Sequence, residues 1–410
     1  MKTASIIKSS CFLALTLGLL ISTSFAQKQK LSEKSINKAN LLKMRIQQAG
    51  KNQNELQKAI ETVPREQRQA LEFLLINMPE YDLKNLTADF LLTNIKLAYQ
   101  ARETAPWNIS DQLFFNNVLP YANIDEPRDP WRKDFYELCQ PIVASCKTPG
   151  EAAQKINATL FRQLSVKYST ARKRANQSPK ESIEQGLASC TGLSIILADA
   201  CRSVGVPARL AGIPSWKNKN GNHTWVEVWD DGWQFTGAAE PNPQGLNRTW
   251  FQGDAALADP DSKLHSIYAA SFQKTDTAFP MVWSPEKRVF AENVTHRYIP
   301  KTTVPNSSTI NLMVRVWNSD KSKREIANVE VLNLNSTTVI ESGTTKAGTA
   351  DMNDMLSFRL APDKTYQLRI SQAAVTKTYE LKTNQKGNQL VELKMPIQDN
   401  ISGKLPQSEK

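Results

Sequence analysis

The sequence is poor in the side chains that most often carry out chemistry, with three histidines and five cysteines in 410 residues. It also has only one strongly apolar run, 11–21, which is too short for the ~20 residues of a transmembrane helix. No nucleic-acid-binding motif accompanies the formal net charge of +11. We therefore expect neither a stable membrane insertion nor a nucleic acid partner.

The N-terminal segment, 1–26, has the pattern of a secretory signal. Lys2 and Lys8 supply its positive charge, and Ser24 and Ala26 are small residues at the expected cleavage site. Cleavage after Ala26 lowers the formal net charge from +11 to +9. We predict an exported protein in the periplasm or outside the cell, and we interpret its remaining positive charge as a solvated face.

Four cysteines follow the signal: Cys139, Cys146, Cys190 and Cys201. An even number in an oxidising compartment favours disulfides. Cys139 and Cys146 are close in sequence and are the pair that we expect to be bridged, which leaves Cys190 available for chemistry. Cys201 lies among apolar residues, so we expect it to be a buried core thiol.

The composition changes along the chain, and the fold class that it predicts is α+β. Residues 27–104 combine a helical spacing of apolar residues with little glycine, which indicates a helical N-terminal region. Residues 105–297 mix helical and strand patterns, and 399–410 form a polar tail. Residues 298–398 contain short β-rich runs but no cysteine, which is typical of a β-sandwich used for binding, spacing or surface attachment. The expected strands there are 310–317, 327–333, 356–360, 365–370, 376–381 and 390–393.

The segment 186–240 holds the only pattern typical of an active site. Cys190 begins an apolar helical pattern, and His223 begins a run that alternates as a strand does. A helix N-terminus and a neighbouring imidazolium each lower the pKa of a cysteine thiol, so this arrangement predicts a thiolate–imidazolium pair. His265 and His296 have no such context, and we interpret them as ordinary polar residues.

Three motifs in this segment resemble the transglutaminase-like superfamily, whose core has the papain-like arrangement. They are Cys190 at a helix start, the sequence Gly-Val-Pro-Ala-Arg at 205–209, and the His-x-Trp-x-Glu pattern of His223, Trp225 and Glu227. The resemblance, which extends to exported bacterial members, implies a transglutaminase-like catalytic domain within 105–297. It implies that the Cys190 thiolate attacks a carboxamide carbonyl to give a thioester, with His223 as proton donor and general base. It also implies that Trp225 binds the substrate.

The third residue of the expected triad departs from the family pattern, which has an aspartate where this chain has Gly237. Glu227 lies ~13 Å along the strand from His223, too far to orient its ring, and Asp231 is farther still. Glu240 is followed by proline, as the family acid often is. We therefore predict Glu240 as the third catalytic residue, while a glutamine, asparagine or backbone acceptor elsewhere remains an alternative.

The expected position of Glu240 depends on the turn between two strands. If Asp231 and Gly232 form a two-residue turn, Asp230 faces Trp233 and His223 faces the residue at 240.

Two classes of function fit these patterns. The first is an exported cysteine-dependent enzyme that acts on a polypeptide or a glutamine-type amide. Hydrolysis by a peptidase or deamidase is favoured over cross-linking, because nothing in the chain resembles a calcium loop. The alternative is a non-catalytic protein that holds a polypeptide or glycan with the same fold. We expect no metal and no other cofactor, and the sequence does not indicate an oligomeric state.

Overall fold

The structure of the protein is a computed structural model that describes residues 37–279, 281, 288–299, 310–347, 355–373, 375–385 and 388–395. The chain divides into two compact units, Met1–Ile95 and Lys96–Lys410. The predicted signal at 1–26 and the predicted tail at 399–410 lie outside the described residues. Within the described ranges, no helix combines the length and the apolar character that crossing a lipid bilayer requires.

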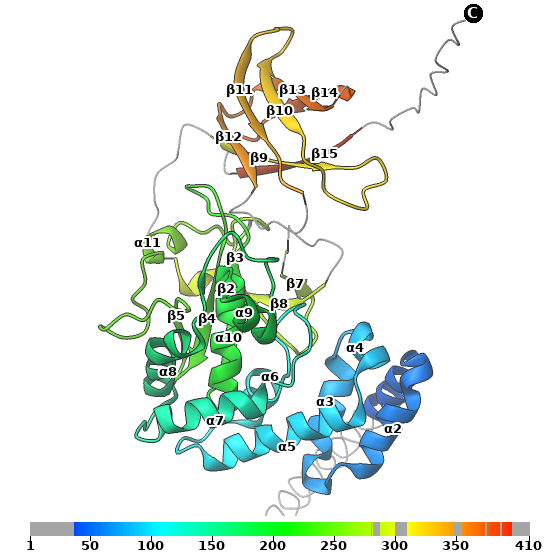
Figure 1. Ribbon diagram of the computed structural model, residues 1–410, viewed down its shortest axis with the longest axis vertical. Helices are drawn as coiled ribbons and strands as arrows, with labels where there is room; N and C mark the ends of the chain where they lie inside the picture. The colour runs from blue at the N-terminus through cyan, green and yellow to red at the C-terminus, as the bar shows by residue number, and fades with distance from the viewer. Residues whose placement is uncertain are drawn as a thin grey trace, which may run out of the picture. The chain divides into compact units, whose positions relative to one another are not determined.

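The first unit is helical where it is described, as the sequence predicts (Figure 1). Leucines at helical spacing, such as Leu56, Leu71 and Leu74, are buried and supply its core. The elements are a helix at 37–48, η1 (Gly50–Asn52), α2 (Gln53–Thr62), η2 (Arg65–Gln67), α3 (Arg68–Asn77), α4 (Glu80–Asn85) and α5 (Ala88–Thr104), which continues into the second unit.

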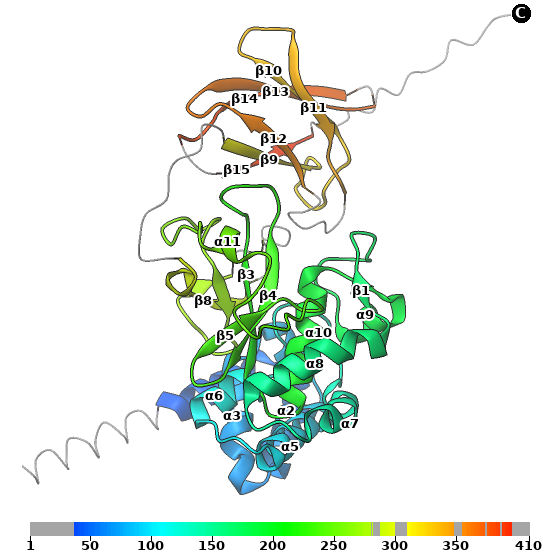
Figure 2. The same cartoon turned by 90° about the vertical axis from the view of Figure 1, so that its left-hand side faces the viewer.

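The second unit contains an antiparallel six-stranded sheet with α8 and α10 packed on one of its faces. α10 (Cys190–Ser203) contacts β3 and β4, and Figure 2 shows α8 and α10 on the same side of these strands. Val226 and Val228 of β4 face the helices, whereas Trp225 joins a second apolar cluster, so the predicted alternation is confirmed. The strand order is β5 (Trp233–Thr236), β4 (His223–Trp229), β3 (Ala208–Ile213), β6 (Tyr268–Ala270), β8 (Phe290–Asn293) and β7 (Thr277–Ala278).

Side-chain caps fix where the helices near the sheet begin. Thr148 caps α8 by accepting a hydrogen bond from Glu151 N at 3.2 Å, and proline follows it at the first helical position. Ser178 and Glu181 form a capping box at the start of α9. The other elements around the sheet are α6 (Asp111–Asn117), α7 (Arg132–Val143), α8 (Pro149–Leu164), β1 (Lys167–Tyr168), α9 (Pro179–Gln185), β2 (Leu187–Ala188), α11 (Gln252–Ala255) and η3 (Thr295–Arg297).

The predicted disulfide between Cys139 and Cys146 is wrong, because both residues are unbridged thiols. Cys139 lies inside α7, which continues to Val143 and carries the chain away from it. A disulfide requires Cα atoms within about 7 Å, which a continuing helix does not provide over this separation. The predicted burial of Cys201 is confirmed, since its side chain has no exposed surface.

The C-terminal strands form two sheets that share one apolar core, so the predicted β-sandwich is confirmed (Figure 1). One strand that the sequence analysis missed, β11, has a mostly exposed surface and therefore lacks apolar alternation. The four-stranded sheet has the order β11 (Val339–Thr344), β10 (Asn328–Asn333), β13 (Thr365–Gln372) and β14 (Val375–Lys382). The three-stranded sheet has the order β12 (Leu356–Leu360), β9 (Ile310–Trp317) and β15 (Asn388–Lys394).

Candidate active site

Cys190 is the first residue of α10, and 6% of it is exposed. The preceding residue, Ser189, caps the helix. Its Oγ accepts a hydrogen bond from Gly192 N at 3.0 Å and donates one to the carbonyl of Ala175. The positive end of the helix dipole and the N–H groups of the first turn therefore lie beside the thiol.

His223 is the first residue of β4, and a direct hydrogen bond joins this strand to α10. Thr191 follows the cysteine, Thr224 follows the histidine, and the two hydroxyl oxygens lie 3.0 Å apart. The Ser194 hydroxyl adds a second link by donating to the carbonyl of Thr224 at 3.1 Å. The two hydrogen bonds fix the start of the helix against the start of the strand, so they fix the positions of Cys190 and His223.

Four aromatic rings surround the His223 imidazole. The distances from its ring centroid are 6.2 Å to Trp216, 5.9 Å to Trp225, 5.0 Å to Trp250 and 4.8 Å to Phe251. Only 7% of His223 is exposed, and its Nε2 atom has no hydrogen-bond partner among the described residues. We call this arrangement the aromatic cage.

The aromatic cage determines the charge of the imidazole. Burial, and then the nearby Lys219 ammonium, lower the pKa of His223 to about 3. The Lys219 Nζ atom lies 5.1 Å from the ring centroid of Trp216 and 4.9 Å from that of Trp250. At neutral pH the imidazole is therefore uncharged in this structure, which corrects the predicted imidazolium.

Cys190 and His223 line one cavity of about 710 Å³, and Glu240 lines it as well. The cavity thus brings together the three residues that are predicted to be catalytic. The other lining residues are Phe161, Arg162, Val166, Lys167, Tyr168, Leu193, Trp216, Lys219, Asn220, Asn222, Thr224, Ala238, Ala239 and Trp250.

The turn between β4 and β5 differs from the prediction by one residue. Trp229, rather than the residue after it, pairs with Trp233, and the turn contains three residues, 230–232. The middle residue of this turn, Asp231, has a left-handed φ of 51°. Because β5 ends at position 236, His223 has no partner on β5 and does not face Glu240 across a ladder.

Glu240 instead lies at the edge of the cavity beside Trp250, whose Nε1 donates to its Oε2 at 2.8 Å. Burial raises the pKa of Glu240, and the hydrogen bond from Trp250 opposes this effect. Asn157 of α8 holds the preceding segment. Its Nδ2 donates to the carbonyl of Gly237 at 2.8 Å, and its Oδ1 accepts from Ala239 N at 2.9 Å.

Gly237 occupies the position where the family pattern has aspartate. A Cβ atom added there would lie 2.3 Å from Oε2 of Glu240, and no left-handed φ requires glycine at this position. The Glu240 carboxylate occupies the region into which a side chain at 237 would project, and its effect on the His223 ring stays a prediction.

Trp225 and Glu227 have packing roles. Trp225 is fully buried and does not line the cavity, so the predicted direct contact with substrate is corrected. Its indole N–H donates to the Tyr298 hydroxyl at 2.9 Å. Glu227 accepts hydrogen bonds from Arg209 at 2.8 Å and from Arg297 at 3.1 Å. Arg209, which ends the Gly-Val-Pro-Ala-Arg motif, and Glu227, which ends the His-x-Trp-x-Glu motif, therefore form a buried ion pair between paired strands.

Several residues of the site gave no signal in the sequence. Trp216 and Lys219 lie in a turn rich in Lys, Asn and Gly, and Trp250 lies in a segment without periodicity. Asn157 is one polar residue on an otherwise ordinary amphipathic helix. Their contacts are long-range, so residue spacing alone does not reveal them.

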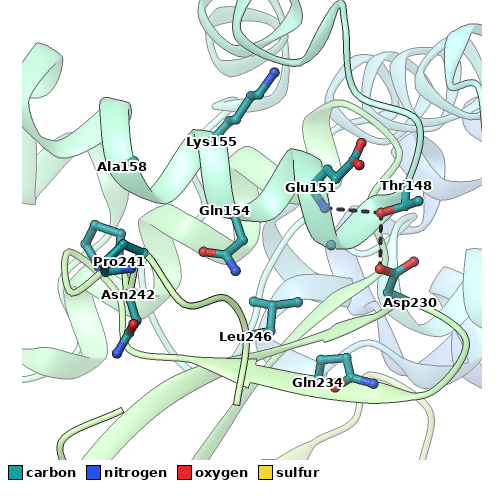
Figure 3. A pocket seen from close by; sticks show the side chains of 12 residues that line it. Thr148, Glu151, Gln154, Lys155, Ala158, Asp230, Gln234, Pro241, Asn242 and Leu246 are labelled. Carbon is teal, nitrogen blue, oxygen red and sulfur yellow. Dashed lines mark hydrogen bonds between the residues drawn. The ribbon is translucent and has the colours of Figure 1, made fainter. Parts of the chain in front are cut away.

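A second cavity, of about 750 Å³, lies along an earlier part of α8 (Figure 3). Figure 3 shows the side-chain amides of Gln154, Gln234 and Asn242 around it, and at one end Thr148 Oγ1 lies 3.1 Å from Asp230 Oδ2. No histidine or cysteine lines this cavity. Of the two cavities, the first is the one that Cys190 and His223 line.

Residues 136–238 match the family model of the transglutaminase-like superfamily. No curated protein sequence matches the chain. Among solved structures, the chain is similar to red sea bream transglutaminase, with 9% identity and a TM-score of 0.36 over 69% of this chain and 65% of that one. It is also similar to a proposed cysteine protease from Cytophaga hutchinsonii, with 19% identity and a TM-score of 0.24 over 39% of this chain and 58% of that one.

The chain spans less than two thirds of the length of each of these two proteins, and TM-scores this low carry no argument about activity. The range that matches the family model contains Cys190 and His223 and ends two residues before Glu240. Residues 136–238 of this chain form a transglutaminase-like domain.

Proposed function

We propose that the protein is a cysteine-dependent enzyme that hydrolyses a peptide or glutamine-type amide through a thioester on Cys190. The observation that carries this proposal is the pair of hydrogen bonds from α10 to Thr224, which holds the cysteine and His223 on one cavity. Enzymes with a transglutaminase-like fold usually depend on a cysteine in this way, which supports the proposal.

The first half of the reaction begins from a thiol and a neutral imidazole. His223 accepts the proton of the Cys190 thiol while the sulfur attacks the carbonyl carbon. The new C–S bond moves the carbonyl electron pair onto oxygen, and the backbone N–H of Cys190 at the helix N-terminus donates a hydrogen bond to this oxyanion. When the oxyanion collapses, the C–N bond breaks and His223 returns its proton to the departing amine.

The second half releases the acyl group. His223 removes a proton from water, the oxygen attacks the thioester carbon, and the sulfur of Cys190 leaves and regains the proton. A primary amine in place of water would give transamidation by the same steps. We propose hydrolysis because the cavity needs to admit only water for this half of the reaction.

Glu240 is the residue that we propose to act on His223 as the third member of the site. Its carboxylate fills the region beside Gly237, where the family pattern places an aspartate. Trp250 contacts both groups, because its indole N–H binds Glu240 at 2.8 Å and its ring lies 5.0 Å from the imidazole ring. Trp250 thus lies between the acid and the imidazole and contacts both.

We further propose that the protein is exported to the periplasm or the extracellular space after removal of 1–26. The charge pattern and small residues of that segment support this localisation. Mass measurement of the protein recovered outside the cytoplasm tests it. A mature chain that still begins at Met1 would contradict it.

One observation favours the alternative of a non-catalytic binding protein. Nε2 of His223 is buried and has no hydrogen-bond partner among the described residues, and Glu240 bonds to Trp250 rather than to the imidazole. A cavity of about 710 Å³ with aromatic walls would suit a bound polypeptide or glycan.

Turnover of a peptide and glutamine-amide library by the purified chain distinguishes these functions. Release of new amino termini indicates a peptidase, release of ammonia indicates a deamidase, and mass addition of a supplied primary amine indicates transamidation. The control is Cys201→Ala, which removes a buried thiol, beside Cys190→Ala and His223→Ala. Binding without any Cys190-dependent product would support the alternative and reject the enzyme.

A further inference from the structure

The ionisable side chains that line the active-site cavity, apart from His223 and the thiol, are mostly positive. Arg162, Lys167 and Lys219 line it, whereas Glu240 is the one acidic residue of the lining. Arg162 is in the last turn of α8, and Lys167 is in β1. The excess of positive charge therefore comes from separate elements that converge on one opening.

Lys167 lies close to the nucleophile through backbone pairing. β1 runs parallel to β2, with Lys167 N donating to Gly186 O at 3.1 Å and Tyr168 paired with Ala188. Ala188 precedes Cys190 by two residues. A charge on β1 thus lies at the side of the cavity from which α10 begins.

Arg162 and Lys167 are exposed, and in the described part of the chain neither has an acidic partner. Lys219 differs, because it forms an ion pair with Asp254 and lies between the rings of Trp216 and Trp250. The first two cations are available to a bound ligand. Lys219 acts as a fixed positive charge near the imidazole.

Glu240 supplies one negative charge against these three cations. Its carboxylate accepts a hydrogen bond from the Trp250 indole, and burial raises its pKa. A substrate without charge would leave Arg162 and Lys167 without a counter-charge, whereas an anionic group would pair with them at the opening of the cavity.

We propose that the acyl donor carries a carboxylate close to the bond that is cleaved, as an acidic peptide does, and that Arg162 and Lys167 bind it. This inference rests on the proposed function, because it names the substrate class of the same thiol site. The bound carboxylate has a second effect. It counteracts the field of Lys219 at His223 and so makes the imidazole a stronger base only when substrate is present.

Two alkylating reagents of nearly equal size test the inference. Iodoacetate is anionic and iodoacetamide is neutral, and both form a thioether with a thiolate and release iodide. Mass spectrometry of the Cys190 peptide gives the second-order rate constant for each reagent. The ratio of the iodoacetate rate to the iodoacetamide rate is divided by the same ratio for glutathione. This normalised ratio reports the effect of charge near Cys190. Any change in the fraction of thiolate affects both reagents and cancels in the ratio.

The expected normalised ratio for the unmodified chain is about 5 to 30 at low salt, because a unit charge about 4 Å from the reagent in water changes the rate roughly fivefold. It falls towards 1 in 1 M NaCl, where the screening length is about 3 Å. Charge reversal in Arg162→Glu with Lys167→Glu lowers it at least tenfold. The matched control is Lys155→Glu, an exposed residue of α8 that lines the other cavity, which keeps the ratio within twofold at 0.15 M salt.

The outcomes separate the two proposals. A normalised ratio of 1 in the unmodified chain, or an equal fall of the ratio in the control and in the double variant, would overturn the proposal of an anionic substrate. The proposal of a reactive thiol would stand. Failure of both reagents to modify Cys190 across pH 6 to 10, with Cys190 accessible in urea, would overturn the thiol enzyme and the substrate class with it.

Discussion

Cys190 and Cys201 lie on the same helix and differ in the surroundings of their thiols. Cys190 begins α10 and lines the cavity, whereas Cys201 is fully buried, and burial raises the pKa of its thiol. We expect Cys190→Ala to abolish turnover with an unchanged unfolding midpoint. We expect Cys201→Ala to lower the free energy of unfolding by about 1 kcal/mol and to leave turnover intact. Parallel assays of rate and urea unfolding test this, and loss of turnover in a folded Cys201→Ala protein would reverse the assignment.

Glu240 tests whether an acid is needed beside the imidazole. Glu240→Gln keeps a hydrogen-bonding group of the same shape and removes the negative charge, so the basicity of His223 should fall. We expect kcat to fall by ~10–10³-fold, which is less than the ~10⁴-fold of a serine-protease triad acid. Rate–pH profiles of both proteins provide the measurement. Superimposable profiles would remove Glu240 from the site.

The space shared by Gly237 and Glu240 allows a rescue experiment. In Glu240→Ala the region beside Gly237 becomes empty, and Gly237→Asp in that variant would place a carboxylate there from the position that the family pattern uses. We expect the rate of the double variant to be at least tenfold higher than the rate of Glu240→Ala alone. Gly237→Ala with Glu240→Ala is the control for volume. Equal rates for the two double variants would show that a carboxylate in this region does not help.

At the scale of elements, the contact between α10 and β4 is the one that the site depends on. Thr224→Val removes one hydroxyl and leaves that of Thr191, which is 1% exposed, without its partner at 3.0 Å. We expect a loss of ~1–3 kcal/mol in the free energy of unfolding, together with a lower kcat. The double variant Thr191→Val with Thr224→Val should lose less free energy of unfolding than the sum of the losses in the two single variants. Neither hydroxyl is then left buried without its partner. Additive losses would indicate that the bond does not couple the two elements.

Local signals predicted the elements that carry Cys190 and His223. The apolar pattern after Cys190 marked α10, and the alternation after His223 marked β4. Alternation predicted which face of β4 holds Trp225. These signals depend on residues close in sequence, so each element is found without knowledge of its neighbours.

The parts that the sequence did not predict depend on contacts between distant segments. The turn at 230–232 took three residues where two were expected, and one residue of slip removed the predicted facing of His223 and Glu240. The aromatic cage combines Trp216 and Trp250 with β4, and no periodicity links these positions. The neutral imidazole follows from that cage, so its charge was mispredicted for the same reason.

At the scale of the whole molecule, the buried imidazole makes folding sensitive to acid. The pKa of His223 is about 3 in the folded chain, whereas the ordinary value of 6.5 applies to the unfolded chain. Below pH 6.5 the unfolded chain therefore binds a proton that the folded chain does not. This contribution to stability is complete above pH 6.5 and is lost as the pH falls towards 3. Between pH 7.5 and 5 we expect the free energy of unfolding of the unmodified chain to fall by about 2 kcal/mol more than that of His223→Gln. Urea unfolding at the two pH values measures it, and equal losses would contradict the buried neutral state.

The glycine at 237 affects how this chain is compared with transglutaminase-like sequences. A survey that classifies proteins by the residue in one alignment column finds no acid at 237. A survey that classifies them by which atoms occupy the same volume finds the carboxylate of Glu240 there, three residues later in the chain. If Glu240→Gln lowers the rate as predicted, this chain is a case in which an acidic group has changed its place in the sequence and kept its place in space.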